Sequence, residues 1–274
     1  MKRFLVLALV LLSGMTASSC SSRPTYPKEH LAQSLQQVLA SEGLPNVPVR
    51  FLDHTLAVHL NYPGVLEQSG GSVGIGEVFN DIGVKLLSCI HRVALSTDAN
   101  IRFYVLLVSD PKMPGAYLTM VRYLDDLRRF QVNMMGMAEM FARMILELNT
   151  GPSDLTLEEY VPRDIQFEEF LSWQLARRIQ RALVEQFQVS GAVDVGRCGG
   201  AFANGEFVFT LNVSPGARGD IPDATMQQIF ETSTTVIATV LSNYRFEGFT
   251  TVRLVLPSAG RNLILPKTQL QSLR

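Results

Sequence analysis

The sequence lacks an excess of basic residues. Its 24 lysines and arginines stand against 25 aspartates and glutamates, which gives a net charge of −1 at pH 7. Binding to nucleic acid requires clustered lysine and arginine, because these side chains displace the counterions of the phosphates. The composition therefore argues against nucleic acid as a partner, and it offers no strongly basic surface for anionic lipid.

Histidine is scarce, with four residues in 274. These residues are His30, His54, His59 and His91. Zinc sites use histidine and cysteine at characteristic short spacings, and neither His54 nor His59 has such a partner. The sequence therefore predicts no metal site.

Long hydrophobic runs are absent apart from one near the start of the chain. Lys2 and Arg3 precede nine apolar residues, Phe4–Leu12, and mostly small residues follow. A basic start, a short apolar stretch and a small-residue end are the three parts of a secretory signal. The apolar stretch is too short to span a bilayer, which needs about 20 residues. We therefore predict a signal peptide at residues 1–19 and an exported chain.

A cysteine stands directly after this signal, in the order Ala17-Ser18-Ser19-Cys20. The segment resembles the lipobox of bacterial lipoproteins, with Ala17 at the place where such signals usually carry leucine. The resemblance implies that Cys20 becomes the first residue and carries several acyl chains such as palmitate, which is enough for stable anchoring in a membrane. Ser21 implies, by the same resemblance, the outer membrane where the cell has one. Ordinary cleavage after Ser19, which would leave a soluble exported protein, is the alternative.

Residues 20–27 are then expected to form a lipidated tether that reaches at most about 28 Å. Loss of residues 1–19 leaves 22 basic and 25 acidic residues, a net charge of −3, so membrane contact depends on Cys20. Two cysteines remain, Cys89 and Cys198. An oxidising compartment would permit a disulfide between them, and two unpaired thiols are the simpler expectation.

Apolar periodicity predicts alternating helices and strands downstream of the tether. Helices are expected where apolar residues recur every three or four positions, at residues 28–41, 77–96, 165–187 and 223–244. Strands are expected at residues 47–52, 55–62, 100–109, 117–122, 192–197, 206–213, 251–256 and 262–265. A glycine-rich loop is expected at Gly64–Gly76.

The longest predicted helix covers residues 124–148 and contains five methionines between Met134 and Met144. Methionine fills irregular gaps in cores and also forms adaptable binding surfaces. Core packing is the first interpretation, and a groove or a partner-binding face is the second. Asp125 and Asp126 begin this helix, where acidic residues complement the helix dipole. We interpret them as structural rather than as general acids or cation ligands.

Both halves of the chain show the same predicted order of helix, two strands, loop, helix and two strands. In a gapless alignment of the two halves, Leu60-Asn61 falls on Leu211-Asn212 and Arg102 falls on Arg253. We therefore predict a duplicated α+β fold with antiparallel sheets and helices on one face. The expected divisions are a first unit at residues 28–149, a linker at 150–164 and a second unit at 165–274.

The glycine-rich loop contains Gly70-Gly71-Ser72-Val73-Gly74, which matches the G-x-S-x-G nucleophile elbow. That motif needs a strand that runs directly into a tight turn and a helix. Val65–Ser69 does not have the pattern of a strand, so a flexible loop is the simpler interpretation and Ser72 is not assigned as a catalytic residue. The glycines also lack the endings of phosphate-binding motifs, so no cofactor is predicted.

Two classes of function remain open on these observations. The first is a non-enzymatic lipoprotein of the cell envelope, held at a membrane through Cys20, which acts as a structural or accessory subunit and binds protein partners. The second is a ligand-binding module or a hydrolase with a pocket near Gly64–Gly76.

Overall fold

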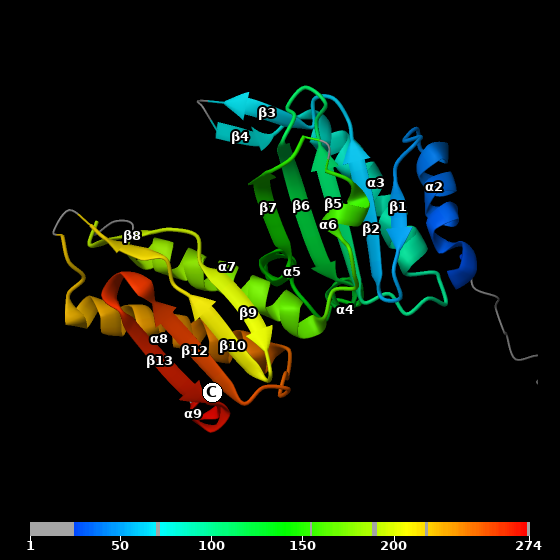
Figure 1. The fold of residues 1–274 in the computed structure, drawn as a ribbon. Helices are drawn as coiled ribbons and strands as arrows, with labels where there is room; N and C mark the ends of the chain where they lie inside the picture. The colour runs from blue at the N-terminus through cyan, green and yellow to red at the C-terminus, as the bar shows by residue number, and fades with distance from the viewer. Residues whose placement is uncertain (1–24, 70–71, 154, 188–190, 217–218, 273–274) are drawn as a thin grey trace, which may run out of the picture.

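The computed structural model describes residues 25–272, apart from 70–71, 154, 188–190 and 217–218 (Figure 1). The predicted signal peptide at residues 1–19, Cys20 and the tether as far as residue 24 lie outside the described residues. Within the described part of the chain, no helix is long and apolar enough to cross a membrane. The chain forms two α+β units, each with its own sheet.

The first unit is a five-stranded sheet with two helices on one face. Its helices are α2 (Leu31–Ser41) and α3 (Val78–Ala94), and its strands are β1 (Val49–Phe51), β2 (Thr55–Asn61), β5 (Phe103–Ser109), β6 (Ala116–Tyr123) and β7 (Ile145–Thr150). The strand order is β1-β2-β5-β6-β7, with β2 and β5 parallel and the other neighbours antiparallel. Figure 1 shows α3 behind this sheet and α2 beside β1.

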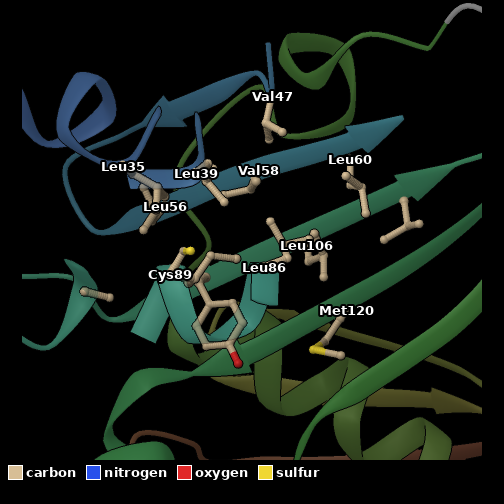
Figure 2. Packing of buried hydrophobic residues seen from close by; sticks show 14 of the residues in the cluster. Leu35, Leu39, Val47, Leu56, Val58, Leu60, Leu86, Cys89, Leu106 and Met120 are labelled. Atoms are coloured by element: carbon tan, nitrogen blue, oxygen red, sulfur yellow. The ribbon is translucent and has the colours of Figure 1, made fainter. Parts of the chain in front are cut away.

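Alternation along the strands directs one set of side chains toward these helices. Leu56, Val58 and Leu60 of β2 lie on this face, because successive strand residues point to opposite sides. Figure 2 shows their neighbours from the two helices, which include Leu35, Leu39, Leu86 and Cys89. Burying a leucine side chain contributes about 1.5–3 kcal/mol relative to exposure, so this face holds the first unit together.

The opposite face of the first sheet is covered by the segment that leads into the second unit. Phe103 and Val105 of β5 pack there against α6 (Leu157–Tyr160) and the first turn of α7 (Phe167–Phe187). Because β5 is buried on both faces, its sequence is continuously apolar rather than alternating. The predicted linker at residues 150–164 thus contains a short helix and contributes to a core.

The second unit is a four-stranded sheet with α7 and α8 (Asp223–Asn243) on one face. Its strands are β9 (Gly199–Ala203), β10 (Glu206–Thr210), β12 (Thr251–Leu256) and β13 (Arg261–Pro266). They follow the order β13-β12-β10-β9, with β10 and β12 parallel. Helix α7 joins the units: Phe170 belongs to the core on the second face of the first sheet, whereas Leu175 and Ile179 belong to the core of the second unit.

The remaining elements are short. They are η1 (Lys28–His30), β3 (Leu66–Ser69), β4 (Ser72–Ile75), α4 (Leu124–Gln131), α5 (Met137–Arg143), β8 (Val193–Val195), β11 (Val213–Pro215), η2 (Pro257–Ala259) and α9 (Lys267–Gln271). Strand β3 pairs with β4, and β8 pairs with β11, as two separate two-stranded sheets.

The predicted α+β class is confirmed, but the prediction of purely antiparallel sheets is wrong. Each main sheet contains one parallel pair, β2 with β5 and β10 with β12. A helix stands between the two strands of each pair in the chain. A helical crossover brings the chain back to the same end of the sheet, so the next strand runs parallel to the strand before the helix.

The single Met-rich helix predicted at residues 124–148 is also wrong. Helix α4 ends at Gln131, a turn follows with Asn133 at φ +58, and α5 begins only at Met137. Residues from Ile145 onward form β7, which extends the sheet beside β6. Leu146 and Leu148 are two residues apart, which is the period of a strand and not of a helix.

Two further boundaries differ from the sequence prediction. The loop expected at Gly64–Gly76 contains the β3–β4 hairpin. The strand expected at residues 192–197 shortens to β8, and the partner of β10 is β9, which the prediction missed.

Glycine and alanine dominate β9, and these residues have low strand propensity. A Cβ on Gly200 would lie 2.2 Å from the carbonyl oxygen of Ser172, so glycine is needed where α7 crosses this strand.

The two main sheets share one order of strands. β1-β2-β5-β6 and β9-β10-β12-β13 each have a parallel pair in the middle and antiparallel pairs outside. In these pairs Thr55 lies beside Phe103, and Glu206 lies beside Thr251. The gapless alignment therefore relates β2 to β10, with Thr55 on Glu206, but it places Phe103 on Leu254 instead of Thr251. Duplication of one ancestral unit stays a prediction.

Candidate functional site

Large apolar side chains are exposed together around α5 and β7. Met137 and Phe141 of α5 are 62% and 51% exposed, and Leu146 and Leu148 of β7 are 41% and 40% exposed. Apolar patches of this kind on a protein surface commonly mark sites of interaction with another molecule. These four side chains are therefore the first candidate for a functional surface.

The local structure explains why they are exposed. Met137 and Phe141 are four residues apart, so they share one side of α5. Met140 and Arg143, which are three residues apart, lie along the neighbouring side that is buried. Leu146 and Leu148 pair across the sheet with Met120 and Leu118, which are buried. The layer formed by α2 and α3 therefore ends over β6, and β7 extends the apolar face of the sheet beyond it.

A groove of about 700 Å³ lies between β7 and α7. Phe141, Leu146 and Leu148 line it from the first unit, and three arginines line it from the second. Arg177 and Arg181 project from α7, and Arg197 lies between β8 and β9. We call this site the β7 groove, defined by Phe141, Leu146, Leu148, Arg177, Arg181 and Arg197.

The β7 groove carries a net positive charge. Glu147 of β7 accepts hydrogen bonds from Arg177 and, at 2.5 Å, from Arg197. Within the described residues Arg181 has no carboxylate partner, and its side chain is exposed. The lining thus contains three guanidinium groups and one carboxylate, so the groove combines an apolar side with a side that attracts anions.

A second cavity of about 800 Å³ lies at the ends of β2 and β5. Its lining includes His59, Ser109 and Tyr117. His59 Nε2 and Ser109 Oγ are 2.8 Å apart, and burial lowers the pKa of His59, so this imidazole is neutral at pH 7. Chemically, the pair can bind a polar ligand or activate a hydroxyl as a nucleophile. Within the described residues, no acid hydrogen-bonds to the second ring nitrogen of His59.

This cavity adjoins the start of the glycine-rich loop. The carboxylate of Asp110 accepts hydrogen bonds from the backbone N–H groups of Gly64 at 2.6 Å and Leu66 at 3.3 Å. These bonds fix the loop beside the end of β5. The sequence did not indicate Ser109 or Asp110, because their roles depend on a parallel pairing of β2 with β5 that the periodicity does not specify.

The local structure around Ser72 differs from that of a nucleophile elbow. It begins β4 in the β3–β4 hairpin, while the motif requires a strand, a tight turn and a helix. Gly70 and Gly71 lie outside the described residues. The structure thus provides no elbow geometry for Ser72.

The histidines and cysteines lie in separate places. His54 Nδ1 contacts the carbonyl oxygen of Asn100 at 3.0 Å, and His91 Nε2 contacts the hydroxyl of Tyr104 at 3.0 Å. Within the described ranges, no group of three histidine, cysteine or acidic side chains could hold a metal ion. Cys89 and Cys198 are both free and buried, in different cores, so the disulfide alternative is wrong.

Asp126 has a structural role that its place in the sequence did not reveal. It is buried between the units, where it accepts hydrogen bonds from Arg143 at 3.0 Å and from the hydroxyl of Tyr244 at 2.8 Å. Tyr244 follows α8, so this contact links the second unit to α4. The helix-dipole interpretation of Asp126 therefore missed its main partners.

No protein-family profile matches the chain, and no curated protein matches it.

Proposed function

We propose that this chain is a membrane-anchored lipoprotein of the bacterial cell envelope that acts as a non-enzymatic accessory subunit and binds a protein partner through the β7 groove. The observation that carries the proposal is the row of exposed apolar side chains along α5 and β7, next to three arginines. Aromatic residues, methionine and arginine are the side chains that protein interfaces favour.

The position of this surface also supports binding rather than folding. Leu146 and Leu148 continue the face on which the side chains of β2, β5 and β6 are buried. A partner that removes apolar surface from water stabilises the complex by about 25 cal/mol for each Å² that it covers. A partner that covers β7 and α5 would extend the existing core, so the surface is suited to a stable contact.

The anchor in this proposal is an acyl-modified Cys20. Metabolic labelling with a palmitate analogue should label the wild-type chain, and Cys20→Ala should abolish the label and release the chain from membranes. Cys198→Ala is the matched control, because it removes a buried thiol and leaves Cys20 in place. A Cys20→Ala chain that fractionates with membranes like the wild type would contradict the anchor.

The partner surface is tested by crosslinking and co-isolation from native envelopes. Phe141→Ser should reduce the yield of crosslinked partner at least fivefold. Ile264→Ser is a matched control, because Ile264 of β13 is 52% exposed against 51% for Phe141 and lies in the other unit. Equal yields from the wild type and Phe141→Ser would argue against the β7 groove as the interface.

An internal duplication is part of the same proposal. The shared strand order of the two sheets supports it, with Thr55 of β2 corresponding to Glu206 of β10 and Phe103 of β5 corresponding to Thr251 of β12. Profiles built separately from the two halves of homologous chains should match each other in this register, with a gap between the two strand pairs. Profiles that match only in another register would contradict a common origin.

A ligand-binding or hydrolytic role at the second cavity is the alternative. The close approach of His59 and Ser109 in this cavity favours it. A fluorophosphonate probe should then label the wild type and Ser72→Ala, but not Ser109→Ala. No label on any of the three proteins would argue against serine hydrolysis at this site.

A further inference from the structure

The strand β7 is the edge of the first sheet on the side of the second unit (Figure 1). It pairs with β6, and no described strand pairs with its other edge. The space beside that edge is the β7 groove, because residues of both β7 and α7 line it. A free strand edge offers backbone N–H and C=O groups to an extended peptide, which can bind by adding one more strand.

The two faces of β7 would give such an added strand different surroundings. Leu146 and Leu148 point to the helix-side face, next to Phe141. Glu147 points to the opposite face, where Arg177 and Arg197 contact it. Since successive residues of a strand alternate between faces, an added strand would place every second side chain beside the leucines and the others beside the arginines.

The charges of the groove select the residues on the second face. The contacts with Glu147 show that Arg177 and Arg197 can bind a carboxylate in this position. Arg181 is exposed on the same helix and has no carboxylate partner within the described residues. An acidic side chain from a partner strand would therefore meet unmatched positive charge, and a basic side chain would be repelled.

The same charges argue against a second copy of this chain as the occupant. Pairing of β7 with β7 of another copy would bring two sets of three arginines together around only two Glu147 carboxylates. Like charges at an interface suppress association. A strand of a different protein, with acidic residues, avoids this repulsion.

We infer that the partner binds the β7 groove through an extended segment in which apolar and acidic residues alternate, added as a sixth strand to the free edge of β7. This inference rests on the proposed function, because it names the kind of segment that occupies the proposed interface. β7 itself, with its Leu146-Glu147-Leu148 sequence, shows the pattern that the groove accommodates.

The test uses the full acylated chain in lipid nanodiscs and fluorescein-labelled decapeptides, with empty nanodiscs as the background. One decapeptide alternates leucine with glutamate, a second alternates leucine with lysine, and a third is the leucine–glutamate peptide with N-methylated alternate amides. Fluorescence anisotropy should show saturable binding of the first peptide and at least tenfold weaker binding of the other two. N-methylation removes the donors that pair with β7 while it keeps the side chains.

Substitutions in the protein give the second readout. Arg181→Glu should weaken binding of the leucine–glutamate peptide at least tenfold, and Ile264→Ser should leave it unchanged. Raising the salt concentration should weaken binding, because the guanidinium groups are partly exposed. Equal binding of the lysine peptide would overturn the acidic specificity, and equal binding of the N-methylated peptide would overturn the strand addition.

Failure of this inference can be separated from failure of the proposed function. If Phe141→Ser reduces partner capture from envelopes but the leucine–glutamate peptide does not bind, the groove remains the interface and the alternating acidic strand is wrong. If Phe141→Ser has no effect on capture and the peptide does not bind, both proposals are wrong.

Discussion

At the scale of single residues, a set of hydrogen-bonded polar groups lies at the buried junction of the two units. The hydroxyl of Tyr244 donates to Asp126 at 2.8 Å and accepts from Nε2 of Gln174 at 2.9 Å. Burial raises the pKa of Tyr244, so the hydroxyl stays protonated and remains a donor. Gln174 also donates to the carbonyl oxygen of Arg143. One phenol thus connects α4, α7 and the end of α8.

Tyr244→Phe should lower the free energy of unfolding by about 1–3 kcal/mol, because it leaves the carboxylate of Asp126 and the amide of Gln174 each short of a buried partner. Urea denaturation followed by circular dichroism measures the change. Tyr62→Phe is the control, since within the described residues the hydroxyl of Tyr62 makes no hydrogen bond. Equal losses for the two variants would contradict the role of the junction.

His91 makes stability depend on pH. Burial, with a smaller contribution from Arg122, lowers its pKa from 6.5 to about 4 in the folded chain. Between about pH 6.5 and pH 4 this histidine binds a proton more readily in the unfolded chain than in the folded chain. Its contribution to the free energy of unfolding is therefore full above this window and is lost as the pH falls through it. Nε2 of His91 lies 3.0 Å from the hydroxyl of Tyr104, which accepts a hydrogen bond from Arg122 and can donate its own proton to the neutral ring.

We expect about 2 kcal/mol of the stability lost between pH 7 and pH 4.5 to come from His91. His91→Gln should remove this part of the pH dependence, because glutamine can still accept from Tyr104 but does not titrate in the window. Urea midpoints at the two pH values measure the effect, with the exposed His30→Gln as control. An unchanged pH dependence in His91→Gln would refute the assignment.

At the scale of elements, close packing of α7 on β9 depends on one glycine. A Cβ on Gly200 would lie 2.2 Å from the backbone oxygen of Ser172, whereas a Cβ on Gly199 would meet its nearest neighbour at 3.9 Å. Gly200→Ala should therefore destabilise the fold by about 3 kcal/mol, because helix and strand must move apart. Gly199→Ala, one residue away, should change the urea midpoint little. A loss of equal size for Gly199→Ala would show that strand propensity, and not helix contact, sets the cost.

The wrong prediction of the helix at residues 124–148 has a physical cause. Met144 and Leu148 are four residues apart and fit a helix, but Leu146 and Leu148 are two apart and fit a strand equally well. The free edge of β6 decided between them, because residues 145–150 gain backbone hydrogen bonds there. Such competition between local spacing and a distant partner cannot be read from the segment alone.

The register of the two halves gives a second example. The gapless alignment of the halves placed Ile101 on Val252, yet strand pairing relates Tyr104 to Val252. A shift by an odd number of residues moves a strand's side chains to the other face. The predicted order of helices and strands therefore indicated the likeness of the two halves, while only backbone pairing shows which residues share a face.

At the scale of the whole molecule, α7 contributes to the cores of both units. The only tryptophan of the chain, Trp173, lies on this helix and packs against the core between the units. We expect one cooperative unfolding transition, in which tryptophan fluorescence and far-ultraviolet circular dichroism have the same urea midpoint. Two separate midpoints would show that the units unfold independently and that the shared helix does not couple them.

The sequence by itself determined the class of fold, the main helices and strands and the likeness in order between the halves, because these depend on local periodicity and on glycine and proline. It also supplied the prediction of a lipid anchor at Cys20, outside the described residues. Tertiary structure decided the parallel strand pairs, the strand β7, the exposed apolar row beside Arg177, Arg181 and Arg197, and the contact of His59 with Ser109. These features join residues that are far apart in the chain, and their formation depends on which strand edges and helix faces remain free when the sheets assemble.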